Sequence, residues 1–199
     1  MRKFQACVLG FIVSFPIFVY SDIEGAPTPG VILCVTDVDT PGGASIVHSG
    51  GLQEGVSAFH DRVDHFWEIL PPELIGADYI ESAQDNADVT DERGTTLEID
   101  VQVVEGTILH MFIEDTIGIV PFPWMNEGTF GANWIDSGER VVGVDGQNFS
   151  VWSTEPLAGD TYVFRQQTED ANFYGIAATF SDLSYIFSNG LEATTCRSD

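Results

Sequence analysis

Carboxylates dominate the side chains that could do chemistry in this sequence. The chain has 31 Asp and Glu residues against 7 Lys and Arg, with a formal net charge of −24. Hard cations such as Ca²⁺ prefer oxygen ligands, and we name Asp85, Asp88, Asp91 and Asp115 as candidate ligands of a structural Ca²⁺. Three of them lie in QDNADVTDERG, residues 84–94, whose spacing is not that of an EF-hand, so a solvated polar loop is the default alternative. We predict no other cofactor.

Tryptophans supply a second possible chemistry, because a sugar can stack its apolar C–H face on an aromatic ring. Trp124 is the best-placed aromatic residue, within an irregular connection rich in proline and glycine. Together with Trp134 and Asp136 it forms the predicted carbohydrate-binding set. For Trp134, as for Trp67 and Trp152, packing in the core is the stronger alternative, since all three lie on or beside expected strands.

The sequence contains none of the common catalytic motifs. There is no Gly-x-Ser-x-Gly elbow, no His-Glu-x-x-His and no Walker loop. His60 and His65 are five residues apart, which places them on opposite faces of a strand rather than around one metal ion. We therefore predict a protein without catalytic activity. A glycan-active hydrolase or lyase is the weaker alternative.

The N-terminus predicts export from the cell. A short cationic start, MRK, precedes an apolar run of roughly 16 residues, and VYS is a typical cleavage sequence, so we predict a signal peptide over residues 1–21. The run is shorter than the ~20 residues of a membrane span, which predicts no stable insertion after cleavage. Residues 22–199 then form a single secreted or periplasmic domain. In that oxidising setting Cys34 and Cys196 are expected to form a disulfide.

The charge also limits the partners. Apart from Lys3 the chain has no lysine, and so acidic a surface repels nucleic acid and anionic lipid. The partners that we expect are extracellular polysaccharides or other components of the cell envelope. A purely structural or adhesive role at the surface is the alternative to ligand binding.

The elements that must position these residues are short strands. Residues 97–103 alternate cleanly between apolar and polar side chains, and with residues 107–114 they predict a hairpin. Short strands recur at roughly ten-residue spacing with turn residues between them, which predicts an all-β fold, an antiparallel β-sandwich or jelly roll.

Two stretches allow more than one interpretation. Apolar residues in 52–70 recur every three or four positions, as on one face of a helix. The stretch 134–152 fits either a ligand-binding loop or two strands joined by a tight turn at Asp145–Gly146, with a second turn at Ser137–Gly138; we favour the strands. Arg62, among apolar neighbours, is expected to pair with an acidic residue from a neighbouring strand.

An ordered series of short motifs adds a family resemblance. FHDRVDHFWEILPPELIGADYIESAQDNAD, LHMFIEDTIG, PFPWM, WIDSGERVVGVD, FSVWSTEPLAGDTYVF and FYGIAA appear in that order over about residues 56–180. Together they resemble an uncharacterised β-sandwich module of exported or surface-sorted bacterial proteins, particularly of planctomycete-like lineages. The resemblance implies no catalytic residues, and it implies that residues 58–67 form a strand, which we adopt over the helical spacing.

Overall fold

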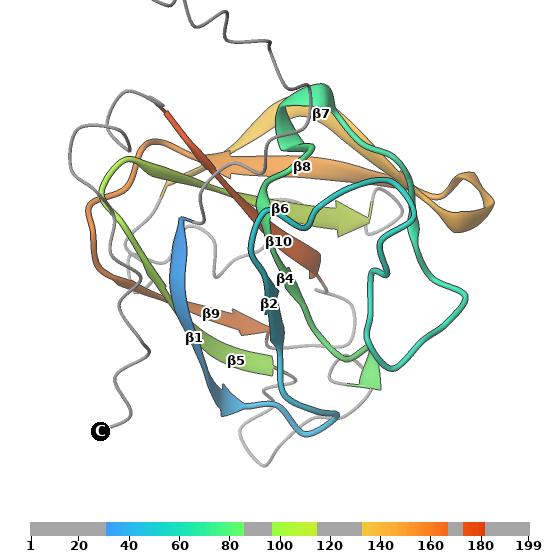
Figure 1. Cartoon of the computed structure of the whole chain (residues 1–199), viewed down its shortest axis with the longest axis horizontal. Coiled ribbons are helices and arrows are strands. Elements are labelled where there is room, and N and C mark those ends of the chain that lie inside the picture. Colours follow the sequence, from blue (N-terminus) through green and yellow to red (C-terminus); the bar gives the residue numbers. More distant parts are fainter. Residues whose placement is uncertain (1–30, 86–96, 115–132, 167–172, 182–199) are drawn as a thin grey trace, which may run out of the picture.

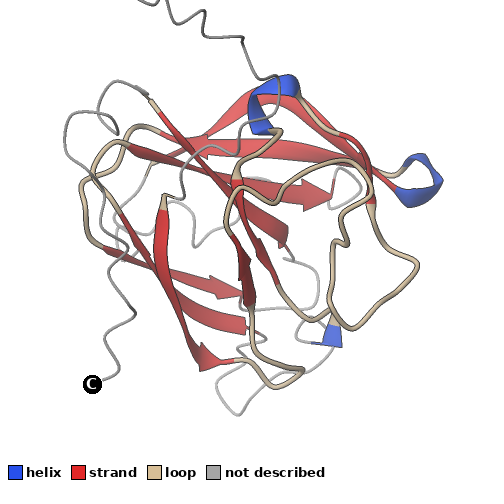
Figure 2. Ribbon diagram, in the orientation of Figure 1, coloured by secondary structure: helices blue, strands red, loops and turns tan. Residues whose placement is uncertain are grey.

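The computed structural model describes residues 31–85, 97–114, 133–166 and 173–181 (Figure 1). Within these ranges the chain consists of strands and loops, and helix is confined to short turns (Figure 2). The strands are β1 (Ile32–Asp39), β2 (Ile46–His48), β3 (Trp67–Ile69), β4 (Asp78–Glu81), β5 (Leu97–Val103), β6 (Thr107–Glu114), β7 (Trp134–Gly143), β8 (Asn148–Thr154), β9 (Thr161–Gln166) and β10 (Phe173–Phe180). The predicted all-β class is confirmed.

The strands form two antiparallel sheets that pack face to face. One has the order β1-β5-β9 and the other the order β2-β4-β10-β6-β8-β7-β3. In Figure 1 the strands of the smaller sheet, β1, β5 and β9, are at the lower left. Both sheets contribute to the apolar core between them. Its fully buried residues include Ile99, Val101, Leu109, Met111, Ile113 and Ile176. The alternation predicted for residues 97–103 is confirmed, since Leu97, Ile99, Val101 and Val103 all belong to this core.

The hairpin predicted from β5 and β6 is wrong. β5 pairs with β1 and β9, whereas β6 pairs with β10 and β8, so the chain crosses from one sheet to the other between them. The crossing is tight, because the backbone N–H and the hydroxyl of Thr107 both donate to the carbonyl of Val104. Apolar residues of both strands face the same core. Two strands on facing sheets bury such residues as fully as two strands of one hairpin, so the pattern cannot tell the two arrangements apart.

A second apolar cluster lies on the outer face of the seven-stranded sheet. There the segment 52–74 covers the sheet, and side chains of both are buried against each other. The cluster consists of Leu52, Ala58, Phe59, Trp67, Leu70, Leu74, Ala77, Tyr79, Phe112, Val141, Phe149, Val151 and Ala177. The larger sheet is therefore covered on both faces, which explains why β4 is buried throughout.

Residues 58–67 form neither the predicted strand nor a helix. They make turns with isolated bridges, Ser57 to Phe66 and Phe59 to Ser82, and a strand begins only at Trp67. The Ser57 hydroxyl donates to the Phe59 carbonyl at 2.6 Å and approaches two further carbonyls at 3.3 Å. Leu52, Phe59 and Leu70 pin this irregular segment onto the sheet, whereas Val63 and Phe66 of the same spacing are exposed, so the spacing does not mark one buried face.

Tyr79 of β4 organises this second cluster. Its ring is fully buried, its hydroxyl donates to the Ala58 carbonyl at 3.1 Å, and the Trp67 indole N–H donates to the hydroxyl at 3.2 Å. Burial raises the pKa of Tyr79 well above its usual range, so the hydroxyl remains a donor. The tyrosine thus ties the covering segment to the sheet at two points.

Gly175 of β10 is required by this arrangement. A Cβ at that position would lie 2.7 Å from Cε2 and 2.9 Å from Oη of Tyr79. We expect Gly175→Ala to lower the free energy of unfolding by about 1–3 kcal/mol, the usual cost of overpacking a core. Urea unfolding measures it, and in a Tyr79→Leu background the further cost of Gly175→Ala should be smaller, because the ring that the new methyl group meets is absent. An unchanged urea midpoint for Gly175→Ala would contradict the close contact.

The stretch 134–152 forms the two paired strands that we favoured. β7 pairs antiparallel with β8, and the chain turns at the short helical turn Val144–Gly146, where Gly146 has φ +74°. Phe149 and Val151 face one core and Trp152 packs against the other. Ser137–Gly138 is not a second turn. It lies within β7, at a bulge between Asp136 and Arg140, because Gly138 adopts φ +81° without ending the strand.

Candidate functional site: an aromatic hollow

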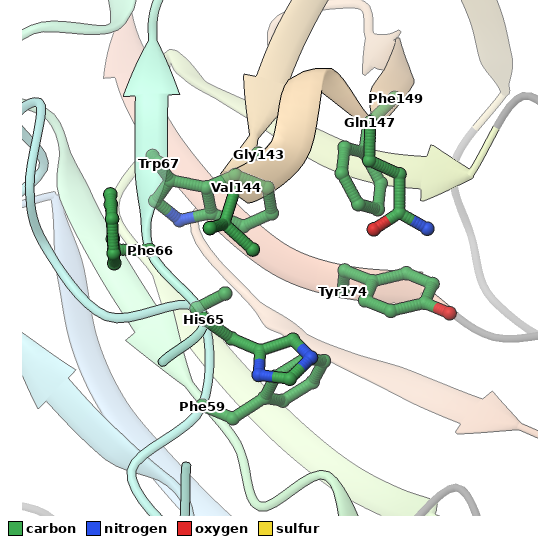
Figure 3. Close-up of a pocket in the computed structure, with 10 residues that line it drawn as sticks. Phe59, His65, Phe66, Trp67, Gly143, Val144, Gln147, Phe149 and Tyr174 are labelled. Atoms are coloured by element: carbon green, nitrogen blue, oxygen red, sulfur yellow. The ribbon is translucent and has the colours of Figure 1, made fainter. Parts of the chain in front are cut away.

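A small hollow opens over the second apolar cluster, between the covering segment, the β7–β8 turn and β10 (Figure 3). It encloses about 230 Å³, including the space open to solvent. Its lining is mostly aromatic and apolar: Ala58, Phe59, His65, Phe66, Trp67, Gly143, Val144, Gln147, Phe149 and Tyr174. We refer to these ten residues as the aromatic hollow.

The rings of the hollow hold one another in edge-to-face contacts. The Phe149 and Tyr174 centroids are 4.9 Å apart at 62°, and those of Trp67 and Phe149 are 5.2 Å apart at 90°. Phe59 meets Tyr174 at 5.4 Å. Such pairs stabilise by about 0.5–1.5 kcal/mol beyond the area that they bury. A Cβ at residue 143 would lie 2.9 Å from Cε2 of Phe149, so glycine allows this ring to lie against the turn. The wall is therefore formed before any ligand arrives.

Polar groups at the edge of the hollow are oriented by carboxylates. The Tyr174 hydroxyl donates to Oε2 of Glu114 at 2.7 Å, and Nδ1 of His65 lies 2.9 Å from Oδ1 of Asp64. The hydrogen bond with His65 is the largest cause that lowers the pKa of the exposed Asp64 carboxyl. Gln147 adds an amide group, directed toward the Tyr174 side of the hollow (Figure 3).

Accessibility divides the lining into a floor and a rim. Phe59 and Trp67 are buried beneath the surface, whereas Phe66 is 37% exposed. His65, Gln147 and Tyr174 are half-buried. The ring surface accessible for stacking is that of Phe66 and part of Tyr174, with a few hydrogen-bonding groups at the edge, as in small-ligand sites.

The structure places two of the three predicted sugar-binding residues, and neither lines the hollow. Trp134 begins β7 and packs against the core between the sheets, with its ring centroid 5.8 Å from that of Phe164. Asp136 accepts the Gly138 N–H at 2.9 Å and lies 3.3 Å from an Arg140 nitrogen. The core alternative for Trp134 is confirmed. Trp124 lies outside the described residues.

Of the candidate calcium ligands, only Asp85 lies within the described residues. Its Oδ1 pairs with Nη2 of Arg62, so Arg62 pairs with a carboxylate as predicted, but Asp85 lies after the end of β4 and not on a neighbouring strand. Asp88, Asp91 and Asp115 lie outside the described ranges, and no group of three His, Cys, Asp or Glu residues able to hold a metal occurs within those ranges. The calcium site stays a prediction.

The Asp-Arg motif at 61–62 has a structural function. The Asp61 carboxylate accepts the N–H groups of Gln84 and Asp85, at 2.8 and 3.1 Å, and Arg62 bonds it as well. Burial alone would raise the pKa of Asp61, but these hydrogen bonds and the arginine outweigh it and lower that pKa. The motif fixes the covering segment to the chain that follows β4.

Two further expectations concern the cysteines and the membrane. Cys34 is buried on β1, but Cys196 lies outside the described residues, so the disulfide between them stays a prediction. Among the described residues, no helix has the length and apolar character needed to cross a membrane.

The residues of the hollow were not predicted as a site. They come from three segments, 58–67, 143–149 and residue 174, which the fold brings together. The available signal was the density of aromatic residues in FHDRVDHFW and in FY at 173–174. That signal does not separate a floor from a rim, because exposure depends on how the covering segment lies on the sheet.

No family model and no curated protein matches the chain. Among solved structures, the chain is similar to "The structure of a beta-glucuronidase from glycoside hydrolase family 2", with a TM-score of 0.57 and 14% sequence identity. The match covers 74% of this chain and 14% of that chain, so this chain spans far less than two thirds of that protein. At this identity the similarity supports the β-sandwich fold alone.

Proposed function

We propose that this chain is an exported, non-catalytic β-sandwich module that binds carbohydrate at the aromatic hollow. The observation that carries the proposal is the accessible ring surface of Phe66 and Tyr174, backed by the buried aromatic wall and lying beside the polar groups of His65, Gln147 and Tyr174. Aromatic faces take the C–H side of a sugar ring, and the edge groups can bond its hydroxyls.

Three observations support parts of this proposal. The fold resembles part of a β-glucuronidase, a protein that acts on a carbohydrate derivative. The apolar N-terminal run and its cleavage sequence support export. The resemblance to surface-sorted bacterial modules agrees with the same location.

Replacing Phe66 by alanine tests the proposal. The ring is partly exposed and outside the buried cluster, so its removal should weaken glycan binding about 5- to 10-fold, equivalent to roughly 1–1.4 kcal/mol of stacking. Retention on immobilised polysaccharides and titration calorimetry with a retained oligosaccharide give the affinity. Thermal unfolding should change little.

Ile75→Ala is the matched control, because Ile75 is an exposed apolar residue that does not line the hollow. It should bind like the unaltered protein. Binding that is lost with Trp124→Ala but not with Phe66→Ala would move the site to Trp124. The absence of binding to every glycan tested would refute the function.

A further inference from the structure

Two carboxylates border the hollow. Two of its lining side chains bond carboxylates directly, His65 to Asp64 and Tyr174 to Glu114. None of the ten lining residues is lysine or arginine. Arg62 and Arg140 both engage carboxylates elsewhere, at Asp61, Asp85 and Asp136.

This charge pattern selects among sugars. A uronic acid would bring a carboxylate beside Asp64 and Glu114 with no lysine or arginine in the lining to receive it, and like charges repel. A protonated amino group meets the opposite conditions. It is attracted by both carboxylates, and by the negative faces of the rings through cation–π interaction.

The two carboxylates differ in how they can contribute. The Asp64 side chain is 77% exposed, and its lowered pKa keeps it charged over a wide pH range. Glu114 is half-buried and fixed by the Tyr174 hydroxyl. Phe66 is the most exposed aromatic ring of the lining, so the surface available for stacking suits about one sugar ring.

We propose that the glycan recognised at the aromatic hollow carries a free amino group, so that the ligand class is an amino sugar rather than a uronate. The inference rests on the proposed function and adds the identity of the ligand class to it. The amino group pairs with Asp64 or Glu114 at the rim while the sugar ring stacks on the aromatic wall.

The test compares matched disaccharides by titration calorimetry at pH 6 and about 0.15 M salt. The probes are a glucosamine dimer, its N-acetylated form, cellobiose and a glucuronate-containing disaccharide. The glucosamine dimer should bind at least about 5-fold more tightly than cellobiose, and the glucuronate probe more weakly than either. Asp64→Asn and Glu114→Gln should each reduce this preference about 3-fold, with little change for cellobiose.

Glu155→Gln is the control for general attraction to an acidic protein. Glu155 is exposed just after β8, six residues along the chain from Phe149, or roughly 20 Å along an extended strand. It should leave the preference intact. Equal binding of cellobiose and the glucosamine dimer, or an equal loss with Glu155→Gln, would overturn the inference and leave the proposed function standing. Failure of all four probes, together with the polysaccharides, would remove the proposed function itself.

Discussion

Replacing Asp78 by alanine is expected to lower the free energy of unfolding by roughly 3–6 kcal/mol. The side chain is 2% exposed, and it accepts three backbone N–H groups: Val31 at 2.7 Å, Ile32 at 2.9 Å and Gly50 at 2.7 Å. Each buried donor left without an acceptor costs about 1–3 kcal/mol. These donors belong to the start of β1 and to the turn after β2, so the carboxylate on β4 joins the two sheets. The loss is a large part of the 5–15 kcal/mol typical of a domain.

Urea unfolding followed by near-ultraviolet circular dichroism measures this effect. Asp160→Ala is the matched control, because the exposed Asp160 accepts only the adjacent Thr161 N–H and its loss should cost less than about 1 kcal/mol. Asp78→Asn keeps one acceptor oxygen and should fall between the two. An Asp78→Ala protein as stable as Asp160→Ala would show that the carboxylate does not hold the two sheets together.

The sequence predicted the strands whose apolar pattern is set by burial of one face, whichever strand they pair with. Residues 97–103 alternate because one face is buried, and β7 and β8 follow from apolar runs around Asp145–Gly146. The pattern does not say which sheet a strand joins, so the β5–β6 hairpin was wrong. It also does not reveal a covering segment: of the apolar residues spaced by three or four in 52–70, Val63 and Phe66 are exposed, so the spacing reflected neither a helix nor one buried face.

The role of individual carboxylates was equally hidden. With 31 acidic residues, composition alone cannot separate Asp78 and Asp61, which accept backbone N–H groups, from exposed residues such as Asp64. The difference depends on donors that lie 23 to 47 residues away in sequence. Motifs around these two residues, in FHDRVDHF and IGADYIES, carried the family resemblance, and in the structure they anchor the fold. The aromatic hollow lies beside them and uses neighbouring residues of the same covering segment.

His110 should make the stability of this protein fall between pH 6.5 and pH 4. The imidazole is 8% exposed on β6, with Nδ1 2.8 Å from the Ser153 hydroxyl and Nε2 2.8 Å from that of Thr179. Burial lowers the pKa of His110 from 6.5 to about 4, because these neutral partners do not offset the cost of a buried charge.

The sign follows from proton binding. Between pH 6.5 and 4 the unfolded chain binds a proton at this histidine and the folded protein does not, so stability increases with pH. The full contribution is present above pH 6.5 and is lost as the pH falls toward 4, by about 3 kcal/mol in all. The lowered pKa of Asp61 acts below pH 3.8, so the two effects occupy separate windows.

Urea unfolding at pH 7.5, 5.5 and 4.5 gives this dependence. His110→Gln cannot titrate but keeps a donor and an acceptor, so it should flatten the pH dependence across the window. His48→Gln is the matched histidine control, because His48 lies at the more exposed edge strand β2 and its replacement leaves the His110 contribution in place. If the unaltered protein and His110→Gln lost equal stability between pH 7.5 and 4.5, the buried imidazole would not be the group that titrates. In that case the two hydroxyls would have to stabilise its charged form, with Ser153 and Thr179 both acting as acceptors.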